Sequence, residues 1–172
     1  MGKKHYVIVS ITLGAIAAIS AVLIGVTNLV TKDRIIQNEK NRIAAGIKEI
    51  FGNNSLISDE EDLKDNGYAY VNYSYTVKAN DEFFGYALRT TGSNMYGKIS
   101  LLVGFGMTYS FSGIYVIINE QTYASTLEDN YLIPLNEGSK ELDDVECGAT
   151  YGAKLVRDMI NEASEVILEI WK

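Results

Sequence analysis

The sequence predicts an α+β fold, in which an N-terminal transmembrane helix and a stalk helix precede a compact domain with an antiparallel sheet. An apolar stretch opens the chain, four strand-like segments occupy its middle, and an amphipathic helix ends it. The short spacings between the segments favour antiparallel neighbours, because parallel strands need long crossover connections. The 172 residues, 47% of them apolar, suit one anchor and one domain.

Residues 6–30 predict a membrane-spanning helix, because Tyr6 carries the only ionisable side chain among them. A helix of about 25 residues rises about 37 Å, which is enough to cross a hydrocarbon core of about 30 Å. A cleaved signal peptide would have a shorter apolar region, of about 7–15 residues, that ends in a small-residue cleavage site. Here the apolar stretch is longer, and no such site ends it cleanly before the charged residues. We therefore expect residues 1–30 to be a membrane-embedded anchor.

The charges lie almost entirely after this span. All 22 acidic and 13 of the 15 basic residues follow it, which gives the remainder of the chain a net charge of −9. This balance argues against nucleic acid or an anionic membrane surface as a ligand. Lys3 and Lys4 precede the span, whereas four basic residues follow it closely, so the positive-inside rule favours a cytoplasmic C-terminal domain.

Residues 31–52 predict an amphipathic stalk helix that continues from the membrane. Its apolar face consists of Ile36, Ile43, Ile47 and Ile50. Asparagines and a glycine at 52–54 end the helix, and residues 58–67 read as a polar, acidic loop. The four consecutive carboxylates at 59–62 lack the spacing of a calcium loop and indicate a solvated charge run. The compact domain is expected at 53–172.

Four strands are predicted, at residues 68–78, 83–91, 98–107 and 113–121. In the first strand the tyrosines change from even to odd positions, so they cannot all lie on one face of a regular strand. This change predicts a β-bulge or a shift of register. A final helix is predicted from Thr150 to about Trp171. Its apolar stripe is expected to pack on the sheet and consists of Leu155, Met159, Ile160, Ala163, Val166, Ile167 and Ile170.

The supply of reactive side chains excludes several kinds of chemistry. Cys147 is the only cysteine, which excludes an intrachain disulfide and any zinc or iron–sulfur site built from cysteines. His5, beside the membrane span, is the only histidine. A Ser-His-Asp or Cys-His catalytic unit therefore cannot assemble in the domain.

Thr150 stands where the last helix begins, directly after Gly148 and Ala149. The start of a helix presents free backbone N–H groups and the positive end of the helix dipole, which together stabilise a phosphate. The small residues allow a phosphorylated group to approach the main chain. The alternative is that Thr150 only caps the helix and Gly148 only forms the loop.

The segment Asp144-Val145-Glu146-Cys147-Gly148-Ala149-Thr150 resembles the Asp-x-x-Ser-Gly-Ala-Thr signature of FMN-binding domains. The helix that follows, and the segments 97–105 and 112–117, resemble that family's next helix and two of its strands. With the N-terminal span included, the chain resembles the small flavoprotein of the Rnf electron-transport complex, the RnfG family. It is also similar to the counterpart of that flavoprotein in the sodium-pumping NADH:quinone oxidoreductase.

The resemblance implies covalent FMN, joined by a phosphoester to Thr150 by a separate flavin transferase that uses FAD and a divalent metal. It implies an electron-relay subunit, rather than a stand-alone enzyme, of an Rnf-type ion-translocating ferredoxin:NAD oxidoreductase. Other membrane subunits of that complex would be its partners, and the domain would lie on the outer face, opposite to the prediction from charge. Asp144 would be part of what the transferase recognises, or else a carboxylate that stabilises the turn.

Several residues depart from the family pattern. Cys147 replaces the usual serine, and Gly152 and Ala153 stand where the family often has Thr and Ser. The family's Glu-Thr-Pro-Gly turn is here Gln121-Thr122-Tyr123-Ala124. The residues expected to bind the cofactor are Thr150, Ala149, Gly148, Cys147, Thr122 and Gln121. Two alternatives stay open: a membrane-anchored binding or scaffold domain without flavin, and a flavinylated carrier of another electron-transfer chain.

Overall fold

The structure, a computed structural model, describes residues 2–170 and divides into two units, Met1–Asn41 and Arg42–Lys172. The helix α1, Lys3–Phe51, forms the first unit and ends in the second. Its apolar side chains in the first unit are exposed, as at Leu13, Ile19 and Ile24. The most apolar window of this helix has a mean hydropathy of 2.6 and is not buried at all. By length and composition it fits a single-pass membrane anchor.

The predicted anchor and stalk form one continuous helix, since no glycine or proline interrupts the chain from Val26 to Ala45. Within the second unit the helix buries Ile43 and Ile47 against the sheet, while Ile50 is partly buried. Ile36 belongs to the first unit and is 43% exposed. The predicted apolar face is therefore used over the last two or three turns.

Five antiparallel strands form one sheet in the order β1-β2-β3-β4-β5, so each strand pairs with its neighbour in the chain. Their bounds are Ser55–Asp62, Val71–Ala79, Glu82–Asn94, Gly97–Gly106 and Phe111–Asn119. The last four confirm the four predicted strands, and the α+β class is confirmed with them.

The strand β1 corrects the prediction of a polar loop at 58–67. It pairs with β2 from Ser55 opposite Ala79 to Asp62 opposite Tyr73, and only Ser55 on it is buried. The sequence lacks the usual alternation because both faces of this edge strand meet solvent. Exposed carboxylates along an edge strand also hinder its pairing with another chain.

The predicted irregularity in β2 is confirmed. The pairing of β2 with β3 shifts between Val71 and Tyr73, and again between Val77 and Lys78. As a consequence Val71 lies in the core cluster on one face of the sheet, whereas Tyr75 and Val77 lie in the cluster on the other. A bulge adds one residue and so reverses the faces of the side chains that follow it.

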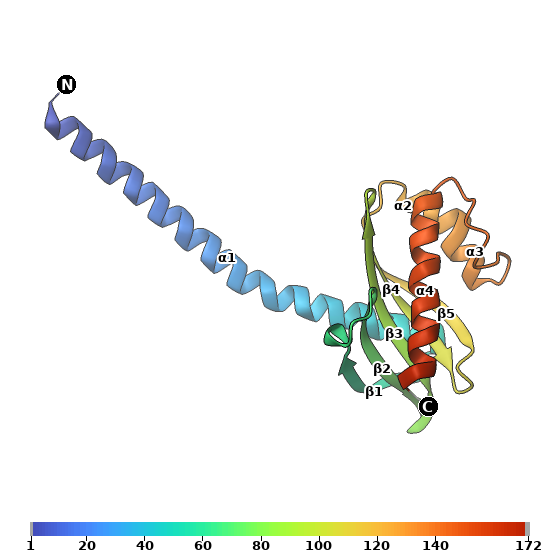
Figure 1. The fold of residues 1–172 in the computed structure, drawn as a ribbon. Helices are drawn as coiled ribbons and strands as arrows, with labels where there is room; N and C mark the ends of the chain where they lie inside the picture. The colour runs from blue at the N-terminus through green and yellow to red at the C-terminus, as the bar shows by residue number, and fades with distance from the viewer. Residues whose placement is uncertain (1, 171–172) are drawn as a thin grey trace. The chain divides into compact units, whose positions relative to one another are not determined.

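Helices cover both faces of the sheet (Figure 1). The end of α1 covers the face that carries Tyr75, Ala87 and Leu102. The helix α4, Thr150–Ile170, covers the opposite face and lies mainly over β3. The predicted apolar stripe of α4 is confirmed as its buried face, with Ile170 partly buried; Trp171 lies outside the described residues.

A helical segment between β5 and the final helix was missing from the prediction. It comprises α2, Ala124–Leu127, then a π-helical turn, Glu128–Leu132, and α3, Ile133–Asn136. These pieces are short and change their periodicity, so they give no sustained helical pattern in the sequence. A single turn, η1, Lys64–Asn66, precedes β2.

Glu162 of α4 ties this helix to the start of β2. Its carboxylate accepts hydrogen bonds from the backbone N–H groups of Ala69, Tyr70 and Val71, at 2.5, 2.6 and 3.2 Å. Hydrogen bonds to a charged acceptor are stronger than those between neutral groups. Glu162 therefore holds α4 against the sheet in addition to its apolar contacts.

We predict that Glu162→Ala destabilises the domain by about 1–3 kcal/mol, because three backbone donors lose their acceptor. For a chain of this size each kcal/mol corresponds to a fall of about 2–4 °C in Tm. Thermal unfolding of the full chain in detergent, followed by circular dichroism, measures the change. Glu165→Ala, at an exposed position of the same helix, is the control. Equal Tm values for the two variants would contradict the prediction.

Candidate functional site

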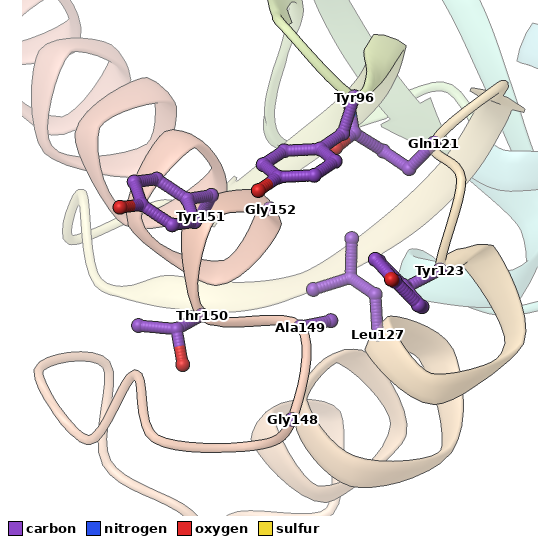
Figure 2. A pocket seen from close by; sticks show the side chains of 9 residues that line it. All are labelled: Tyr96, Gln121, Tyr123, Leu127, Gly148, Ala149, Thr150, Tyr151 and Gly152. Atoms are coloured by element: carbon purple, nitrogen blue, oxygen red, sulfur yellow. The ribbon is translucent and has the colours of Figure 1, made fainter.

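A cavity of about 360 Å³ opens at the start of α4. Figure 2 shows Tyr96, Tyr123 and Leu127 facing the turn of chain that leads into this helix. Its lining comes from the β3–β4 turn, the segment after β5, the loop before α4 and the first turn of α4. The lining residues are Tyr96, Gln121, Tyr123, Leu127, Gly148, Ala149, Thr150, Tyr151 and Gly152. This volume lies within the range of small-molecule sites in proteins, about 300–1,000 Å³.

Thr150 is the first residue of α4 and is partly buried. The backbone N–H of Ala153 donates to the carbonyl oxygen of Ala149 at 3.0 Å, so Ala149 occupies the capping position and Thr150 lies inside the helix. The first backbone N–H groups of a helix have no acceptor within it. A hydroxyl thus lies beside main-chain donors at the positive end of the helix.

Two glycines of the cavity lining have little room for a larger side chain. Gly148 has φ +81°, a left-handed conformation that favours glycine, and its added Cβ would lie 3.2 Å from Cγ2 of Thr126. At Gly152 an added Cβ would lie 3.0 Å from Cδ2 of Leu127 and 3.4 Å from Oε1 of Gln121. Larger side chains at these positions would occupy space beside the helix start.

The helical segment after β5 holds the loop that carries Gly148. Asn130 donates from Nδ2 to the carbonyl oxygen of Cys147 at 3.1 Å. The hydroxyl of the buried Tyr131 donates to the carbonyl oxygen of Leu142 at 2.5 Å. Burial raises the pKa of the Tyr131 hydroxyl, so it remains a donor throughout the physiological pH range.

Asp144 lies outside the cavity, on an exposed part of the same loop. Lys140 donates to its carboxylate at 2.8 Å, and this hydrogen bond is the main reason why the pKa of Asp144 is lowered. Asp144 and Cys147 both line a second hollow on the surface, together with Lys140 and Asn130. The carboxylate is therefore ionised and accessible to another molecule.

Three tyrosines surround the mouth of the cavity. The ring centroid of Tyr96 lies 5.5 Å from that of Tyr151 and 6.0 Å from that of Tyr123, with tilted planes. Tyr123 and Tyr151 are exposed, at 53% and 61%. Together with Leu127 they offer flat apolar surface to a planar ligand, while the helix start offers polar donors.

The structure brings four of the six predicted site residues to the cavity, namely Gln121, Gly148, Ala149 and Thr150. Cys147 is buried in the loop behind it. Thr122 is exposed, and both its N–H and its hydroxyl donate to the carbonyl oxygen of Tyr96, at 2.8 and 3.1 Å. Sequence reasoning missed Tyr96, Tyr123, Leu127 and Tyr151. Three of them come from segments remote from the 144–150 motif, and a single aromatic or apolar side chain is more often a packing residue than part of a site.

Fold and site together define a class of protein. An N-terminal helix that fits a single-pass membrane anchor precedes an antiparallel α+β domain, which has a cavity of small-molecule size at the start of its last helix. Residues 1–50 match the family model described as the RnfG N-terminal region. This match supports an RnfG-type subunit of the Rnf complex, a multi-subunit assembly. No curated protein matches the chain.

We predict that Gly148→Ala lowers the Tm of the chain more than Gly138→Ala does. Both glycines have positive φ, so both substitutions carry the cost of a left-handed residue, about 1–2 kcal/mol. Only at Gly148 does the new Cβ also press on a neighbour, since Gly138 faces open space. Thermal unfolding of both variants in detergent makes the comparison. An equal or smaller loss at Gly148 would show that the loop before α4 adapts freely.

Proposed function

We propose that the chain is a membrane-anchored flavoprotein subunit that relays single electrons through FMN bound covalently to Thr150. It serves an Rnf-type ion-translocating ferredoxin:NAD oxidoreductase. The observation that carries the proposal is the placement of the Thr150 hydroxyl in the first turn of α4, at the rim of a cavity with aromatic walls.

The residues present fit FMN. The N–H groups at the start of α4 suit the phosphate, and the small residues Gly148 and Ala149 allow it to approach the main chain. Tyr96, Tyr123 and Leu127 suit the planar ring system. When bound, FMN supplies the ability to accept and donate electrons, while the chain binds it and fixes its orientation.

Thr150 requires an external catalyst for its modification. The part of the chain that the structure describes shows no histidine or other base at the Thr150 hydroxyl among the cavity residues. In the proposed step a flavin transferase joins Oγ of Thr150 to the FMN phosphorus of FAD. The pyrophosphate bond of FAD breaks, AMP leaves with its electron pair, and a base of the transferase takes the hydroxyl proton. The exposed carboxylate of Asp144 is a contact for that enzyme.

The proposal also assigns the carrier a location and partners. The domain lies on the outer face of the membrane, where a covalent link prevents the loss of FMN. The other membrane subunits of the complex are its partners, and substrate oxidation takes place in them rather than in this chain. The match of residues 1–50 to the RnfG N-terminal region supports membership of a multi-subunit Rnf complex.

Substitution of Thr150 tests the proposal. We predict that wild-type chain, produced together with a flavin transferase, keeps flavin fluorescence in a denaturing gel. Thr150→Val loses the fluorescence completely, because valine has the shape of threonine without its hydroxyl. Intact mass spectrometry is the second measurement, and only the wild type should carry an FMN-sized increment.

Thr126→Val is the matched control, since Thr126 lies near the same loop but does not line the cavity. It should fluoresce like the wild type. Equal fluorescence in wild type and Thr150→Val would exclude Thr150 as the attachment site. A wild-type chain of unmodified mass would instead support a binding or scaffold domain without flavin.

A further inference from the structure

Asn94 joins two elements of the fold through its side-chain amide. Its Oδ1 accepts a hydrogen bond from the backbone N–H of Tyr96 at 2.8 Å. Its Nδ2 donates to the carbonyl oxygen of Tyr151, in the first turn of α4, at 3.1 Å. Asn94 ends β3, so one side chain connects the β3–β4 turn to the start of the last helix.

The carbonyl side of Tyr96 is held by a different segment. Its carbonyl oxygen accepts from both the N–H and the hydroxyl of Thr122, which follows β5. The side-chain amide of Gln121 donates to the carbonyl oxygen of Gly97, the next residue in the turn. The backbone of Tyr96 is thus fixed on its N–H and on its C=O by side chains from two parts of the chain.

This bonding places the Tyr96 ring at the cavity. With the backbone fixed, only the side-chain torsions of Tyr96 remain free, and contacts with the rings of Tyr151 and Tyr123 restrict them further. Figure 2 shows the Tyr96 ring across the cavity from Thr150 and Ala149. Loss of the Asn94 amide would free the N–H of Tyr96 and remove the link to α4, while Thr122 and Gln121 would still hold the carbonyl oxygens of the turn.

We propose that Asn94 is a positioning residue, which fixes Tyr96 against the first turn of α4 and thereby sets the surroundings of the flavin tethered to Thr150. Thr122 supports the same tyrosine from the other side. This role rests on the proposed function, because the flavin is the group whose surroundings Tyr96 defines. Neither side chain itself contacts the flavin ring in this proposal.

Hydrogen exchange in the unmodified full chain tests the link to Tyr96 without any flavin. In Asn94→Ala the amide of Tyr96, measured by NMR in detergent, should exchange at least tenfold faster than in the wild type. The amide of Leu101, in the centre of β4, should keep its rate. Ser93→Ala, at an exposed neighbouring position, should change neither rate. An unchanged Tyr96 rate in Asn94→Ala overturns the proposal.

The chain produced with a transferase tests the effect on the flavin. We expect Asn94→Ala to carry the same FMN-sized mass increment as the wild type, with a shifted visible absorption band and a fluorescence lifetime changed at least twofold. Ser93→Ala should match the wild type. Unchanged spectra in a flavin-bearing Asn94→Ala overturn the proposed role of Asn94 and leave the proposed function standing. An unmodified mass in the wild type counts against the proposed function itself.

A second pair of variants covers loss of the fold. Faster exchange at Leu101 as well as at Tyr96 would mean that Asn94→Ala unfolds the domain. The comparison of Thr122→Val with Thr122→Ser then tests whether the position of Tyr96 sets the surroundings of the flavin. Thr122→Val removes the hydroxyl that donates to Tyr96, and Thr122→Ser keeps it. Thr122→Val should shift the flavin spectrum and Thr122→Ser should restore it. Identical spectra for these two variants overturn the proposal.

Discussion

The packing of α4 on the sheet is the interaction on which the candidate site depends. The buried face of this helix includes Leu155, Met159 and Ile167, and it lies mainly over β3. Burial of apolar surface stabilises this contact, and Glu162 adds charge-assisted hydrogen bonds to the start of β2. Because a helix is stiff, fixing its middle also fixes its first turn, where Thr150 lies.

The site combines three parts of the chain that only the folded sheet brings together. The β3–β4 turn supplies Tyr96, and the segment after β5 supplies Gln121, Tyr123 and Leu127. The loop before α4, together with the first turn of that helix, supplies residues 148–152. Hydrogen bonds between backbone and side chains join these parts, rather than apolar contacts alone. This construction fixes the start of α4, and rigid placement of the bound group is what the proposed redox role requires.

The features that could be predicted from the sequence are those that depend on patterns of neighbouring residues. The apolar stripe of α4, the four regular strands and the bulge after Val71 follow from periodicity and its interruption. The strand β1 has no such pattern, because its charged side chains meet solvent on both faces. The hydrogen bonds from Asn94 to Tyr151 and from Thr122 to Tyr96 join residues far apart in the sequence, so only the structure shows them. The placement of Thr150 could be predicted because its motif and its helix are contiguous.

The covalent tether is the central claim, and tandem mass spectrometry of a proteolytic peptide spanning residues 141–154 tests it most directly. The peptide should come from full chain produced with a competent flavin transferase. The account predicts an FMN adduct whose fragment ions place it on Thr150, with Cys147 and Tyr151 unmodified. An unmodified peptide, or an adduct on any other residue, would contradict it.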